Sequence, residues 1–569
     1  MIDAASSLSP AYRLATLNAL DGGDFDVIIV GGGITGIGCA LDAASRGLTV
    51  ALVEQRDLGS GTSSRSSKLI HGGLRYLEQL AFGLVREALA ERALLRQKIA
   101  PHLVWPIPFV YPLRHRLWER IYVGAGIAFY DVLAKLGHSS MPYHKHLSKK
   151  RLVKAFPGIK KSAFIGGIRY FDAGMDDARF VVAAARTAAR EGALILTSAR
   201  VTGFIRDGEQ VVGVSARCLE SGRSITTRAR VVINATGVWT DSVENLVGDD
   251  KIDVTASKGI HIVIPRDRID SAVGFITKTK TSVLFLIPHE EHWFIGTTDT
   301  AWELDLDHPA ASRSDIRYVL DQLNKVVETE ITEDDIIGVY AGLRPLVTGN
   351  KTSTAKASRE HSITHPAPGL VTIAGGKFTT YRVMAHDTVD RAFESVGIEI
   401  PPSRSDQIAF VGADGFQEML DSTSAIAQKY GVPETQVERL LHRYGSEAID
   451  VLDIALADRH LSEPLPAGAY LRAEVKFAVE HEGALHLDDV LARRTRLSIE
   501  RRDRGVEAAA TVAEIMGGVL GWDSTVVKRE LEHYEARVAA ERESQTMPDD
   551  ATADAARLGA PDVRTLGDA

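Results

Sequence analysis

The pattern of hydrophobic and polar positions near the start of the chain predicts an alternation of strand and helix. Residues 26–30 (DVIIV) form a short, β-branched apolar run that predicts a buried parallel strand, and residues 49–53 (TVALV) predict a second one. Between them, residues 37–46 follow a helical pattern that stops at Gly47. Together these segments predict one strand–helix–strand unit of about 30 residues, the building block of doubly wound α/β domains.

The pattern further along first continues this architecture and then changes. Helices are predicted at residues 84–99 and 177–190, short strands at 193–197, 211–216, 229–234 and 371–374, and a β-rich stretch over 260–300. From residue 405 to residue 540 the helical period dominates, so we predict a separate all-α C-terminal domain. Residues 541–569 are polar, small and acidic, and we expect a disordered tail.

Composition excludes several classes of protein. The 569 residues carry a formal net charge of −9, which argues against a general nucleic-acid binder. Two cysteines, Cys39 and Cys218, cannot form a disulfide framework or a CxxC metal site, and the 18 histidines include no HExxH pair, so we predict no metal. The scarcity of cysteine fits a reducing, cytoplasmic compartment. We expect no signal peptide and no transmembrane helix, because no apolar run is long enough.

Residues 117–134 (LWERIYVGAGIAFYDVLA) allow two interpretations. The uninterrupted apolar run within them, residues 121–130, is too short to span a bilayer. One interpretation is a buried helix. The other is a helix that lies in the membrane interface, because Arg114, Arg116 and Arg120 flank aromatic side chains in this stretch.

The motif GGGITG (residues 31–36) follows the first predicted strand and opens the first helix. In this context Gly31 allows a tight turn, Gly33 lets the backbone approach a pyrophosphate, and Gly36 allows close packing of helix and strand. Glu54 ends the second strand, where its carboxylate is expected to accept hydrogen bonds from an adenosine ribose. FAD or NAD therefore fits better than NADP.

Three later segments favour FAD over NAD. Residues 60–75 (SGTSSRSSKLIHGGLR) supply backbone N–H groups, hydroxyls and the cations Arg65 and Lys68, although an ordinary polar loop has the same composition. Residues 234–237 (NATG) follow a strand and are placed to close over an adenosine. Residues 375–380 (GGKFTT) open a helix whose N-terminal dipole suits the electron-rich edge of a reduced flavin.

These segments belong to a longer series of motifs that occur in one order. The series is SSRSSKLIHGGLRYLE (63–78), INATG (233–237), KGIHIVIP (258–265), IGTTD (295–299), AGLRPL (341–346) and GGKFTTYR (375–382). With it, the chain resembles the respiratory, quinone-linked, FAD-dependent sn-glycerol-3-phosphate dehydrogenases over roughly residues 24–540. A small departure is Val238, where many relatives carry Pro.

The resemblance implies an α/β fold with a Rossmann-like, glutathione-reductase-like FAD-binding domain, a β-rich substrate cap and an all-α C-terminal domain. The implied FAD-binding domain comprises residues 24–100, 171–255 and 340–400, the cap residues 101–170 and 256–339, and the helical domain residues 405–540. The helical domain is expected either to form a homodimer or to brace the FAD-binding domain.

The resemblance also implies a reaction. Non-covalently held FAD would take a hydride from C2 of sn-glycerol 3-phosphate at its N5 atom, dihydroxyacetone phosphate would form, and the electrons would pass to membrane quinone. The enzyme would lie peripherally on the inner face of the cytoplasmic membrane. Two alternatives stay open: an oxidase that passes the electrons to oxygen and releases peroxide, and a non-catalytic FAD-binding protein.

The expected cofactor-binding residues come from the motifs named above. They are Gly31, Gly33, Ile34, Thr35, Gly36, Glu54, Gln55, Ser63, Ser64, Ser66, Ser67, Lys68, Leu69, Ala235, Thr236, Gly237, Trp239, Gly376, Lys377, Phe378 and Thr379.

A phosphomonoester dianion needs two or three cations, and Arg75, Arg344 and Lys377 match the family's substrate-site positions. Tyr76 is expected to contact the substrate, and His261 matches a substrate-site histidine.

Removal of the C2 hydrogen as hydride needs a base for the C2 hydroxyl. His71 matches a histidine that relatives place near flavin N5, and we favour it as the base, with His261 and the cations lowering the pKa of the alcohol. For each histidine the alternative is a buried structural role. The predicted catalytic set is therefore His71, His261, Arg344 and Lys377. Asp299 either orients a neighbour, bonds the flavin or caps a turn.

Overall fold

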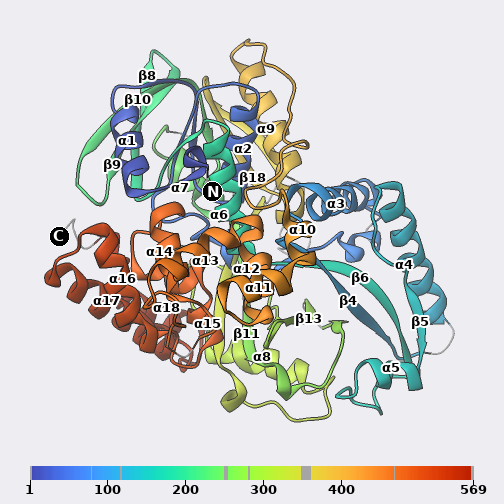
Figure 1. Ribbon diagram of the computed structural model, residues 1–569. Helices are drawn as coiled ribbons and strands as arrows, with labels where there is room; N and C mark the ends of the chain where they lie inside the picture. The colour runs from blue at the N-terminus through green and yellow to red at the C-terminus, as the bar shows by residue number, and fades with distance from the viewer. Residues whose placement is uncertain are drawn as a thin grey trace.

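Two β-sheets and a body of helices make up the molecule (Figure 1). The computed structural model describes residues 3–78, 80–115, 118–248, 254–279, 282–347, 361–466 and 468–565. The helical body, coloured orange to red, packs against both sheets (Figure 1).

The first sheet is built around β1 (Asp24–Val30), which pairs in parallel with β2 (Val50–Val53) and β10 (Ser224–Asn234). Its strand order is β17-β18-β10-β1-β2-β7, with β8 and β9 attached beside β10. The bounds of the other strands are β7 (Leu194–Leu196), β8 (Ala199–Asp207), β9 (Gln210–Cys218), β17 (His361–Ala367) and β18 (Leu370–Gly375).

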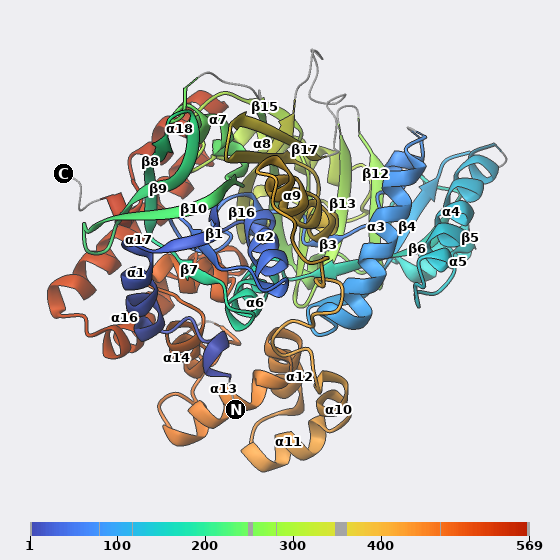
Figure 2. The ribbon, with the colours of Figure 1, turned by 90° about the horizontal axis from the view of Figure 1, so that it is seen from above.

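Layers on both faces bury this first sheet, which explains the continuous apolar run in β1. Helices α2 (Ile34–Ser45), α6 (Asp177–Arg190) and α9 (Tyr381–Ser395) share a core with one face (Figure 2). Helix α1 (Pro10–Leu20) and the β8–β9 hairpin cover the other face. The short helix α7 (Thr240–Glu244) follows β10.

The second sheet has the order β15-β11-β14-β13-β12-β4-β6-β3, with β16 paired to β11 and β5 to β6. Its strands are β3 (Leu69–Ile70), β4 (Val104–Leu113), β5 (Lys145–Ser148), β6 (Gly166–Met175), β11 (Val254–Pro265), β12 (Gly274–Lys278), β13 (Val283–His289), β14 (His292–Gly296), β15 (Thr300–Trp302) and β16 (Gly338–Val347). The helices beside it are α3 (Phe82–Leu94), α4 (Trp118–Leu136), α5 (Lys149–Ala155) and α8 (Arg313–Leu323).

The sheet pairing corrects the predicted domain boundaries. The expected borders at residues 171 and 340 cut through β6 and β16, and both strands belong to the second sheet. Strand β3 lies inside the segment 24–100 that was assigned to the FAD-binding domain, but it pairs with β6 and so belongs to the second sheet. The motifs locate residues along the chain, but they carry no information about which strand each one pairs with.

The helical domain has its own hydrophobic core, as the helical period from residue 405 predicts. Its helices are α10 (Phe416–Asp421), α11 (Thr423–Tyr430), α12 (Glu434–Tyr444), α13 (Ala448–Ala457), α14 (Arg472–His481), α15 (Leu497–Glu500), α16 (Val506–Leu520), α17 (Ser524–Ser544) and α18 (Asp550–Leu558).

The tail prediction is wrong for the described residues up to 565. Helix α17 runs to Ser544, and α18 packs behind it. The carboxylate of Asp550 accepts a hydrogen bond from the buried Lys258 Nζ at 2.5 Å, and Arg564 pairs with Asp489 at 2.9 Å. Polar composition suggested disorder because the partners of these charges lie far away in the sequence.

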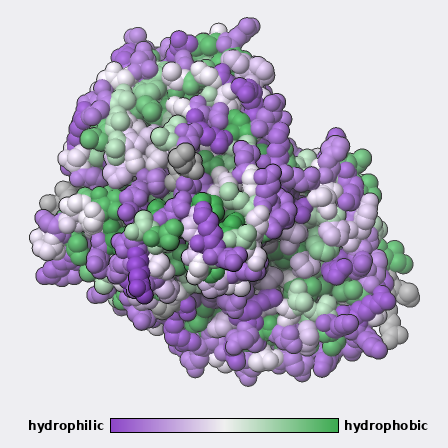
Figure 3. All heavy atoms as spheres, in the orientation of Figure 1, coloured by the Kyte–Doolittle hydropathy of each residue, from purple (hydrophilic) through white to green (hydrophobic). Residues whose placement is uncertain are grey.

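Helix α4 has one buried apolar face, which confirms the first interpretation for that face, and one exposed apolar face, whose contact with a membrane stays a prediction. Ile127, Tyr130 and Leu133 are buried in the core under the helix. On the outer face Ile121 is 70% exposed and Val132 is 53% exposed. The green spheres at the right edge of Figure 3 lie where Figure 1 places this helix.

Buried ion pairs join the helical domain to the first sheet. Asp57, which follows β2, accepts hydrogen bonds from Arg493 Nε at 2.5 Å and from Arg494 Nη1 at 2.7 Å. Asp176, just before α6, pairs with Arg443 and Arg496. These contacts fit the bracing role, while a homodimer stays a prediction.

A second kind of contact across this boundary is a buried histidine. His486 Nε2 lies 2.9 Å from Glu220 in the β9–β10 connection, and Nδ1 lies 3.0 Å from Glu530 in α17. Burial and Arg564 lower the pKa of His486, but the hydrogen bonds to the two glutamates outweigh them and raise it to about 9.

The raised pKa of His486 predicts a pH-dependent contribution to stability. The contribution is fully present below the unfolded pKa of about 6.5 and is lost as the pH rises toward 9. His486→Gln should therefore cost roughly 2–4 kcal/mol of unfolding free energy at pH 6 and much less at pH 9.5. Denaturant unfolding of both proteins from pH 6 to 9.5 measures the difference, and a constant difference would contradict this assignment.

Candidate active site

The glycine turn between β1 and α2 forms the floor of a cleft. Gly31 has a φ of +112°, and a Cβ there would lie 2.7 Å from the carbonyl oxygen of Ala235. Gly33 is the N-cap of α2 and brings no side chain to the helix terminus. The N–H of Ile34 donates to Ser63 Oγ at 3.0 Å. The first turn of α2 thus presents backbone and hydroxyl groups to the cleft.

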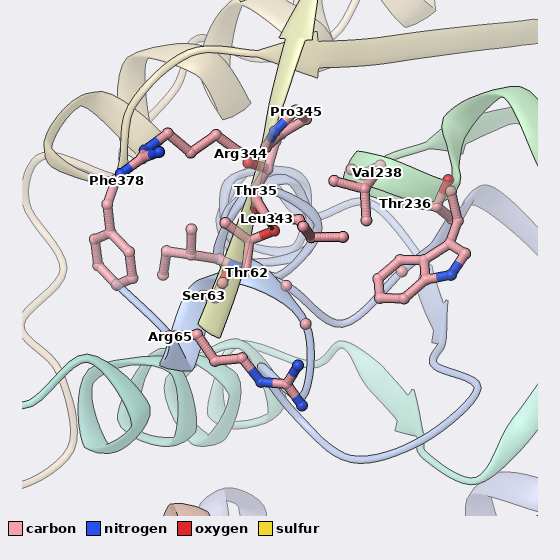
Figure 4. A pocket seen from close by; sticks show the side chains of 18 of the residues that line it. Thr35, Thr62, Ser63, Arg65, Thr236, Val238, Leu343, Arg344, Pro345 and Phe378 are labelled. Atoms are coloured by element: carbon pink, nitrogen blue, oxygen red, sulfur yellow. Dashed lines mark hydrogen bonds between the residues drawn. The ribbon is translucent and has the colours of Figure 1, made fainter. Parts of the chain in front are cut away.

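Figure 4 shows the middle of this cleft. Thr35, Thr62 and Ser63 lie there, between Arg344 and Phe378 on one side and Thr236 and Val238 on the other.

Glu54 is held by the backbone through both carboxylate oxygens. The N–H of Gly32 donates to Oε2 at 2.6 Å, and the N–H of Arg56 donates to Oε1 at 2.7 Å. Burial raises the pKa of Glu54, and these two N–H groups oppose that shift. Each oxygen keeps a further lone pair, so the carboxylate can also accept a ribose hydroxyl.

Asp177 at the start of α6 organises the serine-rich segment. Its carboxylate accepts hydrogen bonds from Ser66 Oγ at 2.7 Å and from Lys68 Nζ at 2.5 Å. Lys68 is 2% exposed and, like Ser64, does not line the cleft. A contact of Lys68 or Ser64 with the cofactor stays a prediction, while the buried lysine has the carboxylate as its counter-ion.

The antiparallel pairing of β11 with β16 places His261 opposite Tyr340 and Ser257 opposite Arg344. The His261 and Tyr340 rings stack with centroids 4.9 Å apart and an interplanar angle of 9°. His261 Nε2 lies 2.9 Å from Ser67 Oγ. The two motifs KGIHIVIP and AGLRPL therefore form one wall of the cleft.

The guanidinium of Arg344 is fixed by the strand connection after β14. It donates to Thr297 Oγ1 at 3.0 Å, to the carbonyl oxygen of Thr298 at 3.3 Å and to Asp299 Oδ1 at 3.5 Å. Ser257 Oγ donates to the same carboxylate oxygen. Of the roles left open for Asp299, the geometry gives it the orienting one.

Lys377 and His71 line the same cleft from other segments of the chain. Lys377 follows β18, and its Nζ is 3.8 Å from the centre of the Tyr76 ring. Thr379 Oγ1 donates to the carbonyl oxygen of His71 at 3.2 Å. The segments GGKFTT and KLIHGGLRY are thus brought together although some 300 residues separate them.

The surroundings of His261 determine its charge. Burial and the charges of Arg344 and Lys68 lower the pKa of His261 to about 3, so its ring is neutral near pH 7. Its Nδ1 has no hydrogen-bond partner among the described residues. A neutral ring can offer one hydrogen bond to a ligand, but it adds no positive charge to a phosphate site.

The cleft encloses about 500 Å³ and collects nearly all the predicted residues. Its lining includes Gly31, Gly33, Ile34, Thr35, Glu54, Gln55, Ser63, Ser66, Ser67, Leu69, His71, Tyr76, Ala235, Thr236, Gly237, Trp239, His261, Arg344, Gly376, Lys377, Phe378 and Thr379. Gly36 lies outside the lining and packs against Gly31, where a Cβ would lie 2.0 Å from the carbonyl oxygen. The side chain of Arg75 falls outside the described part of the structure.

Comparison with known proteins shows the family to which the chain belongs. Residues 26–391 match the model of the FAD dependent oxidoreductase family, and residues 403–527 match the C-terminal domain of alpha-glycerophosphate oxidase. The chain is 50% identical to glycerol-3-phosphate dehydrogenase 2 of Mycobacterium tuberculosis over 562 residues, which are 98% of this chain and 96% of that protein. This chain belongs to the FAD-dependent glycerol-3-phosphate dehydrogenase family.

The chain is also similar to more distant glycerol-3-phosphate dehydrogenases. The mitochondrial glycerol-3-phosphate dehydrogenase of Homo sapiens is 36% identical, with 92% of this chain and 74% of that protein covered. The crystal structure of the glycerol-3-phosphate dehydrogenase from Bacillus halodurans complexed with FAD aligns with a TM-score of 0.77 at 29% identity, covering 93% of this chain and 98% of that chain.

FAD is the cofactor of this family, and the residues present fit it. Any side chain at position 31 would fill the turn. Because Gly31 has none, the backbone there is open to a pyrophosphate. At the far end of the same cleft, Gly376 also has a positive φ of +80°, and the backbone there precedes Lys377 and Phe378. One continuous cavity therefore carries a phosphate turn and a wall suited to a flavin edge.

The sequence motifs did not point to several side chains that hold the cleft in place. Tyr340 stacks on His261, Thr297 holds Arg344, and Asp177 anchors Ser66. The position of Tyr340 could have been predicted from the sequence, because side chains alternate along a strand and residue 340 therefore shares a face with Arg344. No sequence pattern predicts the roles of Asp177 and Thr297, since their partners are distant in the sequence.

One group of side chains bears on the prediction of no metal. Potential ligand atoms of His289, Glu290 and Glu500 lie within 4.8 Å of one another. Arg496 pairs with Glu290 at 3.0 Å and with Glu500 at 2.6 Å, so a cation already balances both carboxylates. The absence of a metal stays a prediction.

The glycine turn yields a matched pair of substitutions. Gly31→Ala should weaken FAD retention at least tenfold, because the new methyl group would collide with the backbone at Ala235. Gly47→Ala is the control, since Gly47 also has a positive φ, of +86°, but open space around it. Flavin absorbance per protein after purification and dialysis measures retention. Equal flavin loss in the two variants would show that backbone strain, not the close approach, is responsible.

Proposed function

We propose that this chain oxidises sn-glycerol 3-phosphate at C2 and releases dihydroxyacetone phosphate. The observation that carries the proposal is that Arg344, Lys377, His71 and His261 line the cleft that also holds the dinucleotide turn. Two fixed cations suit a dianionic phosphate, and the arginine fork can bind two of its oxygens. The name of these relatives, glycerol-3-phosphate dehydrogenase, supports the same substrate.

The roles of the residues follow from their surroundings. When bound, FAD supplies the oxidant that accepts the C2 hydrogen as a hydride. Arg344, oriented by Thr297 and Asp299, holds the phosphate, and Lys377 in the same cleft adds the second positive charge.

His71 takes the proton of the C2 hydroxyl. His261, with a pKa of about 3, is a poor proton acceptor near pH 7, so the role of the base goes to His71, which lines the same cleft. Neutral His261 contributes a hydrogen bond to the substrate instead.

Replacement of Arg344 tests the substrate assignment. Arg344→Gln should lower kcat/KM for sn-glycerol 3-phosphate by roughly 10- to 150-fold, the range of a lost charge-assisted hydrogen bond. Arg391→Gln is the control, because Arg391 is exposed on α9 and pairs only with Glu394 among the described residues. Steady-state kinetics with an artificial electron acceptor give the values. Undiminished turnover in Arg344→Gln would refute the phosphate site, and a wild-type protein whose flavin the substrate never bleaches would refute the enzyme.

We further propose that the electrons pass to membrane quinone and that α4 places the enzyme on the inner face of the cytoplasmic membrane. Within the described ranges, no helix combines the length and apolar character needed to cross a bilayer. The outer face of α4 instead offers Trp118, Ile121 and Tyr122 at its start and Val132 and Leu136 at its end, all of them exposed. Aromatic and aliphatic side chains on one face are typical of interfacial helices.

Two neighbours of α4 support this orientation. An apolar groove beside it is lined by Leu74 and Leu77, which flank Tyr76 of the active-site cleft, so a quinone in the groove would lie close to the flavin end. The basic side chains Lys145, Lys149 and Lys150 on the adjoining segment are exposed and suit anionic headgroups.

Vesicle binding tests the membrane surface. Ile121→Asp and Val132→Asp should each weaken binding to phosphatidylglycerol-containing vesicles roughly tenfold or more, because each removes an apolar side chain that lipid would bury. Both side chains are exposed, so folding should be unaffected. Leu456→Asp is the matched control, since Leu456 is 66% exposed on α13, in the helical domain. Sedimentation with vesicles measures binding, and equal loss in all three variants would contradict the assignment to α4.

The electron acceptor is decided by re-oxidation of the substrate-reduced enzyme. Under anaerobic conditions sn-glycerol 3-phosphate should bleach the flavin, and a short-chain quinone should restore its colour much faster than air does. Fast recovery in air with stoichiometric peroxide would instead identify the oxidase alternative.

A further inference from the structure

A second cavity, of about 80 Å³, lies where the helical domain meets the two sheets. Its wall carries an unusual concentration of positive charge, from Arg65, Lys68, Arg493, Arg496, Arg537 and Arg557. Glu541 is the single acidic side chain in that wall within the described ranges. The space exceeds the roughly 10–15 Å³ that one water needs, so a small ion fits.

Five of these six cations have carboxylate partners. Lys68 pairs with Asp177, Arg493 with Asp57 and two other aspartates, and Arg496 with Asp176 and two glutamates. Arg537 pairs with Asp488, which Arg493 already shares, and Arg557 reaches Glu541 only at 3.9 Å. Most of these carboxylates belong to residues outside the cavity wall, so the side chains that face the cavity are mainly cationic.

Arg65 is the exception. Its guanidinium forms no hydrogen bond or ion pair with any residue that the structure describes, and its half-buried side chain lines both this cavity and the cofactor cleft. Its side chain points away from Arg344, the expected phosphate ligand (Figure 4). A half-buried guanidinium without a protein counter-ion can take an anionic partner, and Arg65 borders two spaces that could hold one.

The pKa values express the same excess of charge. Burial and the charges of Arg537, Arg56, Arg557 and Arg493 lower the pKa of Arg65 to about 9. Burial and Arg557 also lower the pKa of Arg537, to about 10. The guanidinium groups thus lie close enough to repel one another, and an anion between them would turn that repulsion into attraction.

We propose that this cavity is a binding site for a small oxyanion of the phosphate class, separate from the substrate site. The anion would join Arg65, in the segment after the glycine turn, to Arg537 in α17 and Arg557 in α18. Guanidinium forks match the oxygens of a tetrahedral anion. Occupancy would therefore tie the last two helices to the FAD-binding segment. This inference does not depend on the identity of the oxidised substrate.

Thermal unfolding of the holoenzyme with increasing inorganic phosphate tests the site. The experiment uses the Arg344→Gln variant as its background, so that phosphate in the substrate site does not contribute. Potassium chloride at equal ionic strength corrects for screening. We expect phosphate to raise Tm beyond the chloride series, as any ligand of the folded state does.

Two charge-removing substitutions in that background localise the effect. Arg557→Gln should weaken the apparent phosphate affinity roughly tenfold or more, the cost of one charge-assisted hydrogen bond. Lys528→Gln, which removes an equal charge from an exposed position of α17, should leave it unchanged. If Arg557→Gln does not fold, Arg65→Gln replaces it, with the same expected loss of phosphate response.

The outcomes identify the class of anion that binds and the results that overturn the proposal. A response to inorganic phosphate assigns the site to the free ion, and a stronger response to glycerol 3-phosphate assigns it to phosphomonoesters. A Tm that phosphate raises no more than chloride overturns the proposal, and this is also the result expected if the pyrophosphate of bound FAD already fills the cavity. An unchanged response in Arg557→Gln or Arg65→Gln overturns it as well.

Discussion

The burial of arginine–carboxylate pairs between the helical domain and the first sheet is the constraint on which the structure depends. Asp57 meets Arg493 and Arg494, and Asp176 meets Arg443 and Arg496. Such charges lose their hydration on burial, so removing one partner leaves an uncompensated charge at a cost of about 3–5 kcal/mol. The helical domain is for this reason an integral part of the fold and not an appendage.

The same constraint shapes the cleft. Asp57 lies three residues after Glu54, so the pairs that fix the helical domain also fix the loop in which the N–H of Arg56 donates to the Glu54 carboxylate. At the start of α6, Asp177 follows Asp176 directly and anchors Ser66 and Lys68. The charged boundary and the serine-rich wall of the cofactor site are thus positioned by adjacent residues on the same elements.

Helix α4 connects the apolar surface with the catalytic segment through polar groups. Its inner residue Tyr130 donates to Asp172 at 2.8 Å and accepts from the N–H of Gly72 at 3.0 Å. Arg92 pairs with the same aspartate. Gly72 follows His71, so the outer apolar face and the active-site loop are held by one buried network, in which each polar group is costly to leave unpaired.

The local order of residues in the sequence determined the strand–glycine turn–helix unit, the helical domain and nearly all of the cleft's lining, because periodicity and turn chemistry are short-range properties. The tertiary structure alone decided which distant charges meet. Lys68 pairs with Asp177, Asp550 pairs with Lys258 in a tail that composition marked as disordered, and Tyr340 stacks on His261. Buried charges and rings take the partners that packing brings to them, and no spacing along the chain encodes those partners.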